Sequence, residues 1–336
     1  MIRTGLTDLL GIRHPIVLGG MSGGTSAELV AAVSDAGGFG IYGASFTVTS
    51  VAGQIDDVRA VLDRIRSLTS AAFGVNLLLF GSSDADVDAV LSLRPRVLAT
   101  AWPKEDTDLR SISRRAHEAG ALWMHQVDRL DGAKRAAEAG ADIIVAQGTE
   151  GGGHVGVLAT LPLTRMVVRE CAPIPVVAAG GIADGEGIAA ALMLGAQGVL
   201  LGTRLLATNE SPLPAGYKQA IVASDGHDTV LSEIPDIASG RVWPGAYARV
   251  RVNAFIKEWS GREGELRRRR DEVRKGVAAA RSAGDAEHGS LLIGQDAGLI
   301  DSIEPAGALI ARLVADAERV LAQVSGLVVD ARTPAP

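Results

Sequence analysis

The sequence has very few of the residues that build disulfides, metal centres or aromatic platforms. Its one cysteine, Cys171, excludes an intramolecular disulfide and a thiolate metal cluster, and a reducing cytoplasm is the expected location. The histidines are scattered without HxH or HExxH spacing, so no metal site is expected. Aromatic residues make up 4% of the chain, which argues against a stacking surface for single-stranded nucleic acid.

Long apolar runs and a strong net charge are also lacking. No run of about 18 apolar residues occurs and no export signal is recognisable, so we expect a soluble protein that does not enter a membrane. The net charge of −6 argues against a general surface for nucleic acid or anionic membranes. With 336 residues, 47% of them hydrophobic, the chain can fill one large α/β barrel or two smaller domains.

What the sequence does contain is a series of short apolar runs separated by segments with helical spacing. Eight runs are predominantly apolar, which is typical of strands buried on both faces. They span residues 15–20, 39–41, 73–79, 96–100, 121–126, 141–145, 175–179 and 198–201. Helices are expected at 25–36, 51–67, 85–93, 108–119, 129–139, 161–171, 185–194 and 305–324. The alternation predicts an α/β fold with a parallel sheet.

The glycine-rich turns favour a closed (β/α)8 TIM barrel over an open, doubly wound sheet. An open sheet normally carries its phosphate-binding glycines after the first strand. Here the turns richest in glycine follow the first, sixth, seventh and eighth expected strands. In a barrel these turns all meet at the carboxyl ends of the strands, where active sites are built.

The chain changes character after residue 208. Four prolines and a charged run at 262–275 replace the strand–helix alternation between residues 209 and 289. We therefore expect residues 1–208 and 290–325 to form the barrel and residues 209–289 to form a helical lid over the substrate. The charged run is expected to be a solvated helix face, and residues 326–336 a flexible tail.

Four aromatic residues of the expected lid allow two interpretations. Trp243, Tyr247, Phe255 and Trp259 could line a substrate pocket or form the core of the lid. Large aromatic side chains contribute most of their energy by burial, so the core is the favoured interpretation.

The loop after the sixth strand carries the clearest sign of chemistry. Five glycines fall within the nine residues 148–156, and glycine lets a backbone approach a ligand closely. Gln147 precedes them and His154 lies among them, and histidine is the side chain best suited to proton transfer near neutral pH. The alternative is a glycine-rich turn with an incidental histidine.

Two further turns resemble a phosphate site. Gly180 and Gly181 follow the seventh strand, and the run Leu200, Leu201, Gly202, Thr203 and Arg204 follows the eighth. In barrels these two turns commonly bind phosphate through backbone N–H groups at a helix start. Thr203 could bind phosphate or cap a helix, and Arg204 could add charge or brace the loop.

Two carboxamides at strand ends, Asn76 and Gln147, could bind the pyrimidine-like edge of a cofactor, because an amide both donates and accepts hydrogen bonds. Each could instead cap a loop. Together with the phosphate site, they indicate a phosphorylated cofactor across the barrel mouth. The residues alone do not distinguish between FMN and a sugar phosphate as the ligand.

The motifs resemble those of the nitronate monooxygenase (formerly 2-nitropropane dioxygenase) family, and nearly as closely those of FMN-dependent enoyl-acyl-carrier-protein reductases. The resemblance covers roughly residues 8–325. It rests on the blocks PIVLGGM at 15–21, GVN at 74–76, QGTEGGGH at 147–154, AAGGIADG at 178–185 and GTR at 202–204. One departure is Gly151, where the family usually has alanine.

The resemblance implies a role for each matching residue. FMN would be held by Asn76, Gln147, Gly152, Gly180, Gly181, Leu200, Leu201, Gly202 and Thr203. Gly20 and Met21 would lie beside the flavin ring, and His154 would be the catalytic residue.

The implied reaction is the oxidation of an alkyl nitronate, such as propionate 3-nitronate, or of a nitroalkane, by O2 to a carbonyl compound and nitrite. An NAD(P)H-dependent enoyl-thioester reductase is the main alternative. Gln147 favours the monooxygenase, because the reductases tend to carry glutamate there, whereas the run 180–185 resembles the reductases at least as closely as the monooxygenases. A phosphate-binding barrel without turnover is the non-enzymatic alternative. The expected partners are a small-molecule substrate and O2, and the assembly considered is a homodimer.

Overall fold

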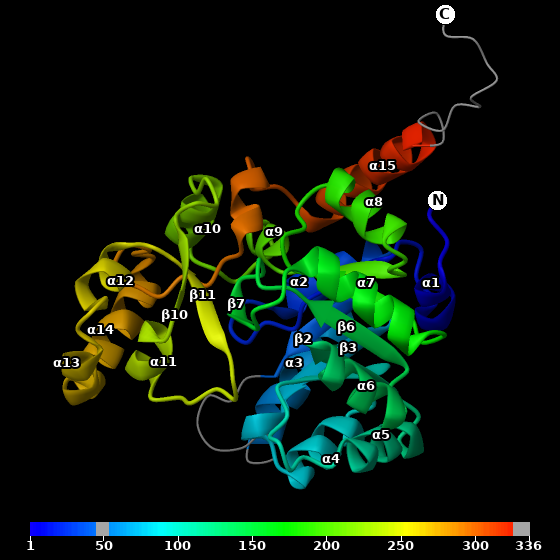
Figure 1. Ribbon diagram of the computed structural model, residues 1–336, viewed down its shortest axis with the longest axis horizontal. Coiled ribbons are helices and arrows are strands. Elements are labelled where there is room, and N and C mark those ends of the chain that lie inside the picture. The colour runs from blue at the N-terminus through cyan, green and yellow to red at the C-terminus, as the bar shows by residue number, and fades with distance from the viewer. Residues whose placement is uncertain (45–53, 325–336) are drawn as a thin grey trace, which may run out of the picture.

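Eight parallel strands form the centre of the molecule, which is seen in a computed structural model that describes residues 1–44 and 54–324 (Figure 1). They are β1 (Ile16–Leu18), β2 (Gly40–Gly43), β3 (Phe73–Leu78), β4 (Val97–Ala101), β5 (Leu122–Val127), β6 (Ile143–Gln147), β8 (Val176–Ala179) and β9 (Gly198–Leu201). The sheet order is β1-β9-β8-β6-β5-β4-β3-β2, and a parallel bridge between Val17 and Phe39 joins its two ends. The predicted TIM barrel is confirmed.

Helices surround this barrel in the expected alternation. They are α2 (Ala27–Asp35), α3 (Ile55–Leu68), α4 (Asp84–Ser92), α5 (Leu109–Glu118), α6 (Leu130–Glu138), α7 (Thr160–Cys171), α8 (Gly185–Met193) and α15 (Ala306–Val324). Ser26, Asp108 and Asp184 cap α2, α5 and α8 by accepting hydrogen bonds from backbone N–H groups. The expected start of the second helix at Val51 and the expected tail at 326–336 lie outside the described residues.

Side chains of the strands divide between two cores, because successive residues of a strand face opposite sides. Met124 and Val145 pack inside the barrel, and Trp123 and Ile144 pack between the sheet and the helices. A short helix, α1 (Gly5–Leu10), closes the amino-terminal end of the barrel with Leu6 and Leu10. The other end is therefore the one left for a site. Cys171 is a buried residue at the end of α7.

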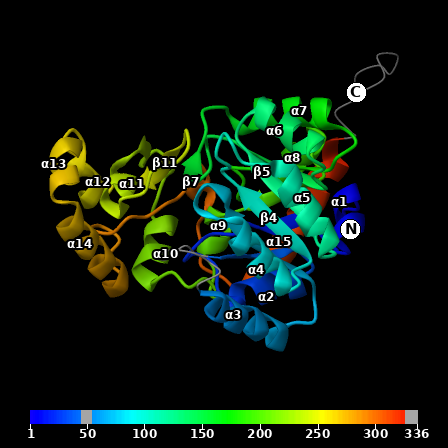
Figure 2. The same ribbon diagram turned by 90° about the horizontal axis from the view of Figure 1, so that it is seen from below.

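Residues 209–289, called the insertion below, form a lobe beside the barrel (Figures 1 and 2). It contains α10 (Ala215–Val222), β10 (Thr229–Ser232), α11 (Ile234–Ser239), β11 (Tyr247–Arg251), α12 (Ala254–Trp259), α13 (Glu263–Arg268) and α14 (Arg270–Ala283). The insertion is thus not purely helical. Its strands continue through β7 (Gly153–Val155), so that the barrel's glycine loop completes an antiparallel sheet of order β10-β11-β7.

Phe255 and Trp259 lie in the core of the insertion with Ile234 and Leu266, as predicted. Most charged side chains of α13 and α14 are exposed, which agrees with a solvated helix face. In the part of the chain that the structure describes, no helix combines the length and apolar character that a membrane crossing requires.

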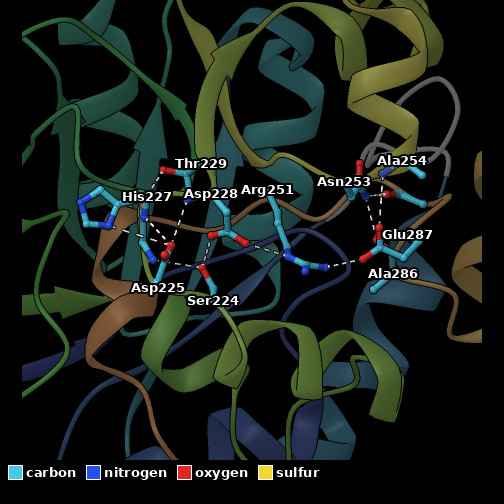
Figure 3. Close-up of polar contacts among 12 residues, drawn as sticks. Ser224, Asp225, His227, Asp228, Thr229, Arg251, Asn253, Ala254, Ala286 and Glu287 are labelled. Atoms are coloured by element: carbon cyan, nitrogen blue, oxygen red, sulfur yellow. Dashed lines mark hydrogen bonds and ion pairs between the residues drawn. The ribbon is translucent and has the colours of Figure 1, made fainter.

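A polar network holds the insertion's sheet to the chain that returns toward the barrel (Figure 3). Arg251 bridges Asp228 at 3.0 Å and Glu287 at 2.8 Å. Asn253 donates to the carbonyls of Ala286 and Gly289, at 2.7 Å each. Asn253 is buried, whereas Glu287 is about half exposed, so the two hydrogen bonds of Asn253 form the shielded part of this connection between β11 and the returning chain.

Candidate functional site

A cavity opens at the carboxyl ends of the barrel strands. Its walls come from β1 to β5, β6 and β9, and the residues lining it are Gly20, Ile41, Asn76, Leu78, Ala99, Thr100, Ala101, Met124, Gln126, Val145 and Leu200. A larger hollow of about 580 Å³, lined by Arg66, Arg94 and Arg96 among others, lies at the amino-terminal ends of β3 to β5. The first cavity is the candidate site, because barrel enzymes build their sites at the carboxyl ends.

Three of the predicted cofactor residues, Gly20, Asn76 and Leu200, line this cavity together. A Cβ atom on Gly20 would lie 2.4 Å from the Cβ of Asn76, so only glycine lets β1 and β3 approach this closely. Met21 follows, and its sulfur lies 3.6 Å from the position of a Cβ on Gly202. The turns after the first and last barrel strands therefore meet at one edge of the mouth.

Gln147 is the last residue of β6, and its orientation is set by a neighbour. Gln126 at the end of β5 donates from Nε2 to Oε1 of Gln147 at 2.7 Å. The amide nitrogen of Gln147 is therefore directed away from Gln126. The amide oxygen of Gln147 is already engaged, so its NH2 group is the part left for a ligand at the mouth.

The glycine turns after β6 and β8 pack against each other. Gly180 and Gly181 have φ values of 96° and 74°, which favour glycine. A Cβ on Gly151 would lie 3.4 Å from the Cα of Gly180, and Glu150 accepts hydrogen bonds from the N–H and hydroxyl of Thr160 at 2.9 Å each. The loop is thus anchored to the start of α7, close to the turn predicted to bind phosphate.

Thr203 is the first residue of α9 (Thr203–Leu206), and Gly202 occupies the position before the helix. The Thr203 hydroxyl does not cap α9. It accepts a hydrogen bond from the N–H of Gly294 at 2.9 Å. The returning chain thereby closes one side of the predicted phosphate turn. Burial raises the pKa of the Asp296 carboxyl to about 7.

Arg204 braces the loop and does not face the mouth. Its side chain is fully buried and donates to the carbonyl of Ser302 at 3.0 Å and to Glu304 at 3.3 Å. Leu201 also points away, because its side chain is buried in the core between sheet and helices. Any contact of Leu201 with a ligand would therefore use its backbone.

Gly152 lies under the returning chain, since a Cβ there would be 2.5 Å from the carbonyl carbon of Ile293. The next residue but one, His154, lies in β7 opposite Ala248 of β11. Its Nε2 lies 2.8 Å from Oδ1 of Asp236 in α11, and the two side chains are 10% and 13% exposed. Among the described residues no cluster of three or more His, Cys, Asp or Glu side chains could hold a metal ion.

One face of the His154 ring is covered by an aromatic side chain, which contacts two further aromatic rings. The Trp243 ring stacks on that of His154 with centroids 3.4 Å apart and planes 10° from parallel. Phe80 and Trp102, which follow β3 and β4, lie 4.6 Å and 6.1 Å from Trp243. Trp102 has a φ of 53°, a strained conformation that is enriched at functional sites. The preference for a core role is therefore wrong for Trp243, which joins the barrel mouth to the insertion, and Tyr247 is largely exposed.

Sequence reasoning missed Gln126, Asp236 and Trp243 as members of this site. Gln126 had a usable signal, because it is a polar residue at the end of an apolar run, like Asn76. Asp236 and Trp243 had none, since their position beside His154 depends on the pairing of β7 with β11.

Comparison with known proteins places this site in a wider context. A family model described as Nitronate monooxygenase matches residues 3–93 and 83–316. The chain is similar to a (3aS,4S,5R,7aS)-5-hydroxy-7a-methyl-1-oxo-octahydro-1H-indene-4-carboxyl-CoA dehydrogenase of Mycobacterium tuberculosis, with 33% identity over 97% of this chain and 99% of that protein. It is also similar to a probable nitronate monooxygenase of Staphylococcus aureus, with 31% identity over 94% and 98%. The structure of FabK from Thermotoga maritima matches with a TM-score of 0.85 and 34% identity, over 98% of this chain and 100% of that one.

Proposed function

The chain belongs to the nitronate monooxygenase family of flavin-dependent oxidoreductases, and from that premise we propose that it uses FMN to oxidise alkyl nitronates with O2 to carbonyl compounds and nitrite. The observation that carries the proposal is the position of His154. It lies between the ring of Trp243 and the carboxylate of Asp236, and Trp243 in turn contacts Phe80 and Trp102 at the carboxyl ends of β3 and β4. An imidazole held in place by an aromatic ring and a hydrogen-bond partner suits the recognition of a small anion such as a nitronate.

The residues at the mouth fit FMN. Gly20 has no side chain that would obstruct a flat flavin ring beside Asn76. The NH2 group of Gln147 would donate a hydrogen bond to the polar edge of that ring. Gly181 and the start of α9 would receive the phosphate through backbone N–H groups. When bound, FMN supplies the electron acceptor and the reaction with O2.

The protein's own side chains would bind and orient the substrate. His154 would stabilise the negative charge of a nitronate, or accept the α-proton when the substrate is a neutral nitroalkane. Trp243, Phe80 and Trp102 would exclude water from the same space, which strengthens electrostatic interactions there.

A second candidate is an oxidoreductase of thioesters, such as an NAD(P)H-dependent enoyl-thioester reductase. Two similarities favour it: the relative whose name is that of a carboxyl-CoA dehydrogenase, and the match to FabK. Its chemistry would use the same cavity and the same histidine.

The test is a visible spectrum of the purified protein followed by anaerobic additions to the same sample. Flavin bands that change on addition of propionate 3-nitronate alone, with nitrite formed once O2 is admitted, are the expected result. Rapid bleaching by NADPH without any response to nitronate would favour the thioester reductase. The absence of flavin bands even after FMN is added would overturn both.

A further inference from the structure

We propose that Asp236 is a positioning residue for His154, and that the insertion thereby completes the active site. The effect of Asp236 on catalysis rests on the proposed function. The Nε2–Oδ1 distance of 2.8 Å is that of a strong hydrogen bond. Both side chains are nearly buried, so water competes little for either partner. A carboxylate only accepts hydrogen bonds, which places a proton on Nε2 of the histidine.

The consequence is a defined tautomer. With the proton on Nε2, the lone pair of a neutral imidazole is on Nδ1. Nδ1 would then accept the α-proton of a nitroalkane, while the C–H electron pair moves toward the nitro group and leaves a nitronate. The carboxylate of Asp236 would stabilise the imidazolium formed, as in the orientation of a catalytic histidine by a buried aspartate.

The insertion holds Asp236 rigidly. On the same helix, Ile234 and Ala238 are buried in the insertion core. The backbone carbonyl of Asp236 accepts from the N–H groups of Gly240 and Arg241, at 2.8 Å and 3.0 Å. On the other side, pairing of β7 with β11 fixes the backbone of His154. Trp243 then fixes the ring plane, so all three constraints on the imidazole come from the insertion.

Other charged groups close to the loop are engaged elsewhere. Arg249 in β11 donates to the carbonyl of Thr149 at 2.8 Å and to the hydroxyl of Thr229 at 3.3 Å. Glu150 is bound to the start of α7 through Thr160. Asp236 is therefore the carboxylate that the structure gives to His154.

The experiment compares the FMN-loaded wild type with Asp236→Asn by ¹⁵N NMR of histidine-labelled protein, using His154→Asn to assign the signal. The wild type is expected to show His154 with Nε2 protonated. Asp236→Asn should lose this preference, retain FMN, and lower kcat for nitroalkane by about 10- to 100-fold, less than the loss in His154→Asn. Glu233→Gln is the matched control, since it removes a carboxylate of which 57% is exposed and which lies immediately before α11.

The outcomes separate the two proposals. A wild-type His154 with its proton on Nδ1, or a signal unchanged in Asp236→Asn, would overturn the positioning role whatever the substrate. The wild-type spectrum decides this even where the variant folds poorly. Suppose that the wild type has its proton on Nε2 of His154 and that Asp236→Asn loses this preference, but that neither nitronate nor nitroalkane is oxidised. This result would overturn only the proposed function.

Discussion

The hydroxyl of Thr203 and the backbone N–H of Gly294 are joined by a 2.9 Å hydrogen bond that links the last barrel turn to the chain returning from the insertion. The two residues are 91 positions apart, and the contact is buried. The predicted phosphate turn is thus built from two distant segments, and its shape depends on both.

Replacing Thr203 by valine should therefore affect both stability and flavin retention. The buried N–H of Gly294 would lose its partner, at a cost of about 1 to 3 kcal/mol. We expect a lower thermal midpoint for the flavin-free protein and weaker FMN binding in a fluorescence titration. Thr203→Ser keeps the hydroxyl and is the control. Equal behaviour of the two variants would mean that the hydroxyl has no such role.

Asp296 predicts a specific pH dependence of stability. Burial raises the pKa of its carboxyl from 3.8 to about 7, so the folded state favours the protonated form. The resulting contribution to the free energy of unfolding is present below about pH 4 and is lost as the pH rises to about 7. Across this interval the contribution changes by about 4 kcal/mol.

Asp296→Asn should remove this dependence. In urea unfolding of the flavin-free protein, the variant is expected to gain stability relative to the wild type between pH 5 and pH 8. The control is Asp106→Asn, which removes an exposed carboxylate. A constant difference between Asp296→Asn and wild type over this range would contradict the raised pKa.

The proposed role of His154 is tested by His154→Asn. FMN should stay bound, because His154 is not among the residues that line the cavity. Turnover of a neutral nitroalkane should fall by about 10²-fold or more, as expected for loss of the group that accepts its α-proton. His227→Asn, at a side chain that is 94% exposed, should behave like the wild type. Unchanged turnover in His154→Asn would remove this residue from the mechanism.

Trp243→Ala should open the enclosure around His154. Stacked rings contribute about 0.5 to 1.5 kcal/mol beyond their buried area, so this variant is expected to be less stable. Diethyl pyrocarbonate should also modify His154 faster, as measured by mass spectrometry of the peptide that contains it. Trp243→Phe retains a ring and should stay close to the wild-type rate. Equal modification rates in all three proteins would show that the stacking does not shield the histidine.

The sequence allowed the barrel and its glycine turns to be predicted because both depend on local patterns. Apolar runs specify buried strands, and the close approach of Gly20 to Asn76 requires a residue without a side chain. The pairing of His154 with Asp236, 82 residues apart, depends instead on an inter-element contact that leaves no local pattern. Trp243 was assigned to the wrong environment for the same reason.

Variants of Gln126 test the proposed hydrogen bond between the Gln147 amide and FMN, because Gln126 holds the Gln147 amide in one orientation. Gln126→Leu removes the donor and frees Gln147, and FMN affinity should fall by about 10-fold, equivalent to one hydrogen bond. Gln126→Glu replaces the donor by an acceptor, so the Gln147 amide should turn and present its oxygen to the mouth. If the flavin edge requires a hydrogen-bond donor, Gln126→Glu should therefore bind FMN more weakly than Gln126→Leu does. Fluorescence titration with FMN measures the affinity of the wild type and of the two variants. Equal affinities would mean that Gln147 does not contact the cofactor through its amide.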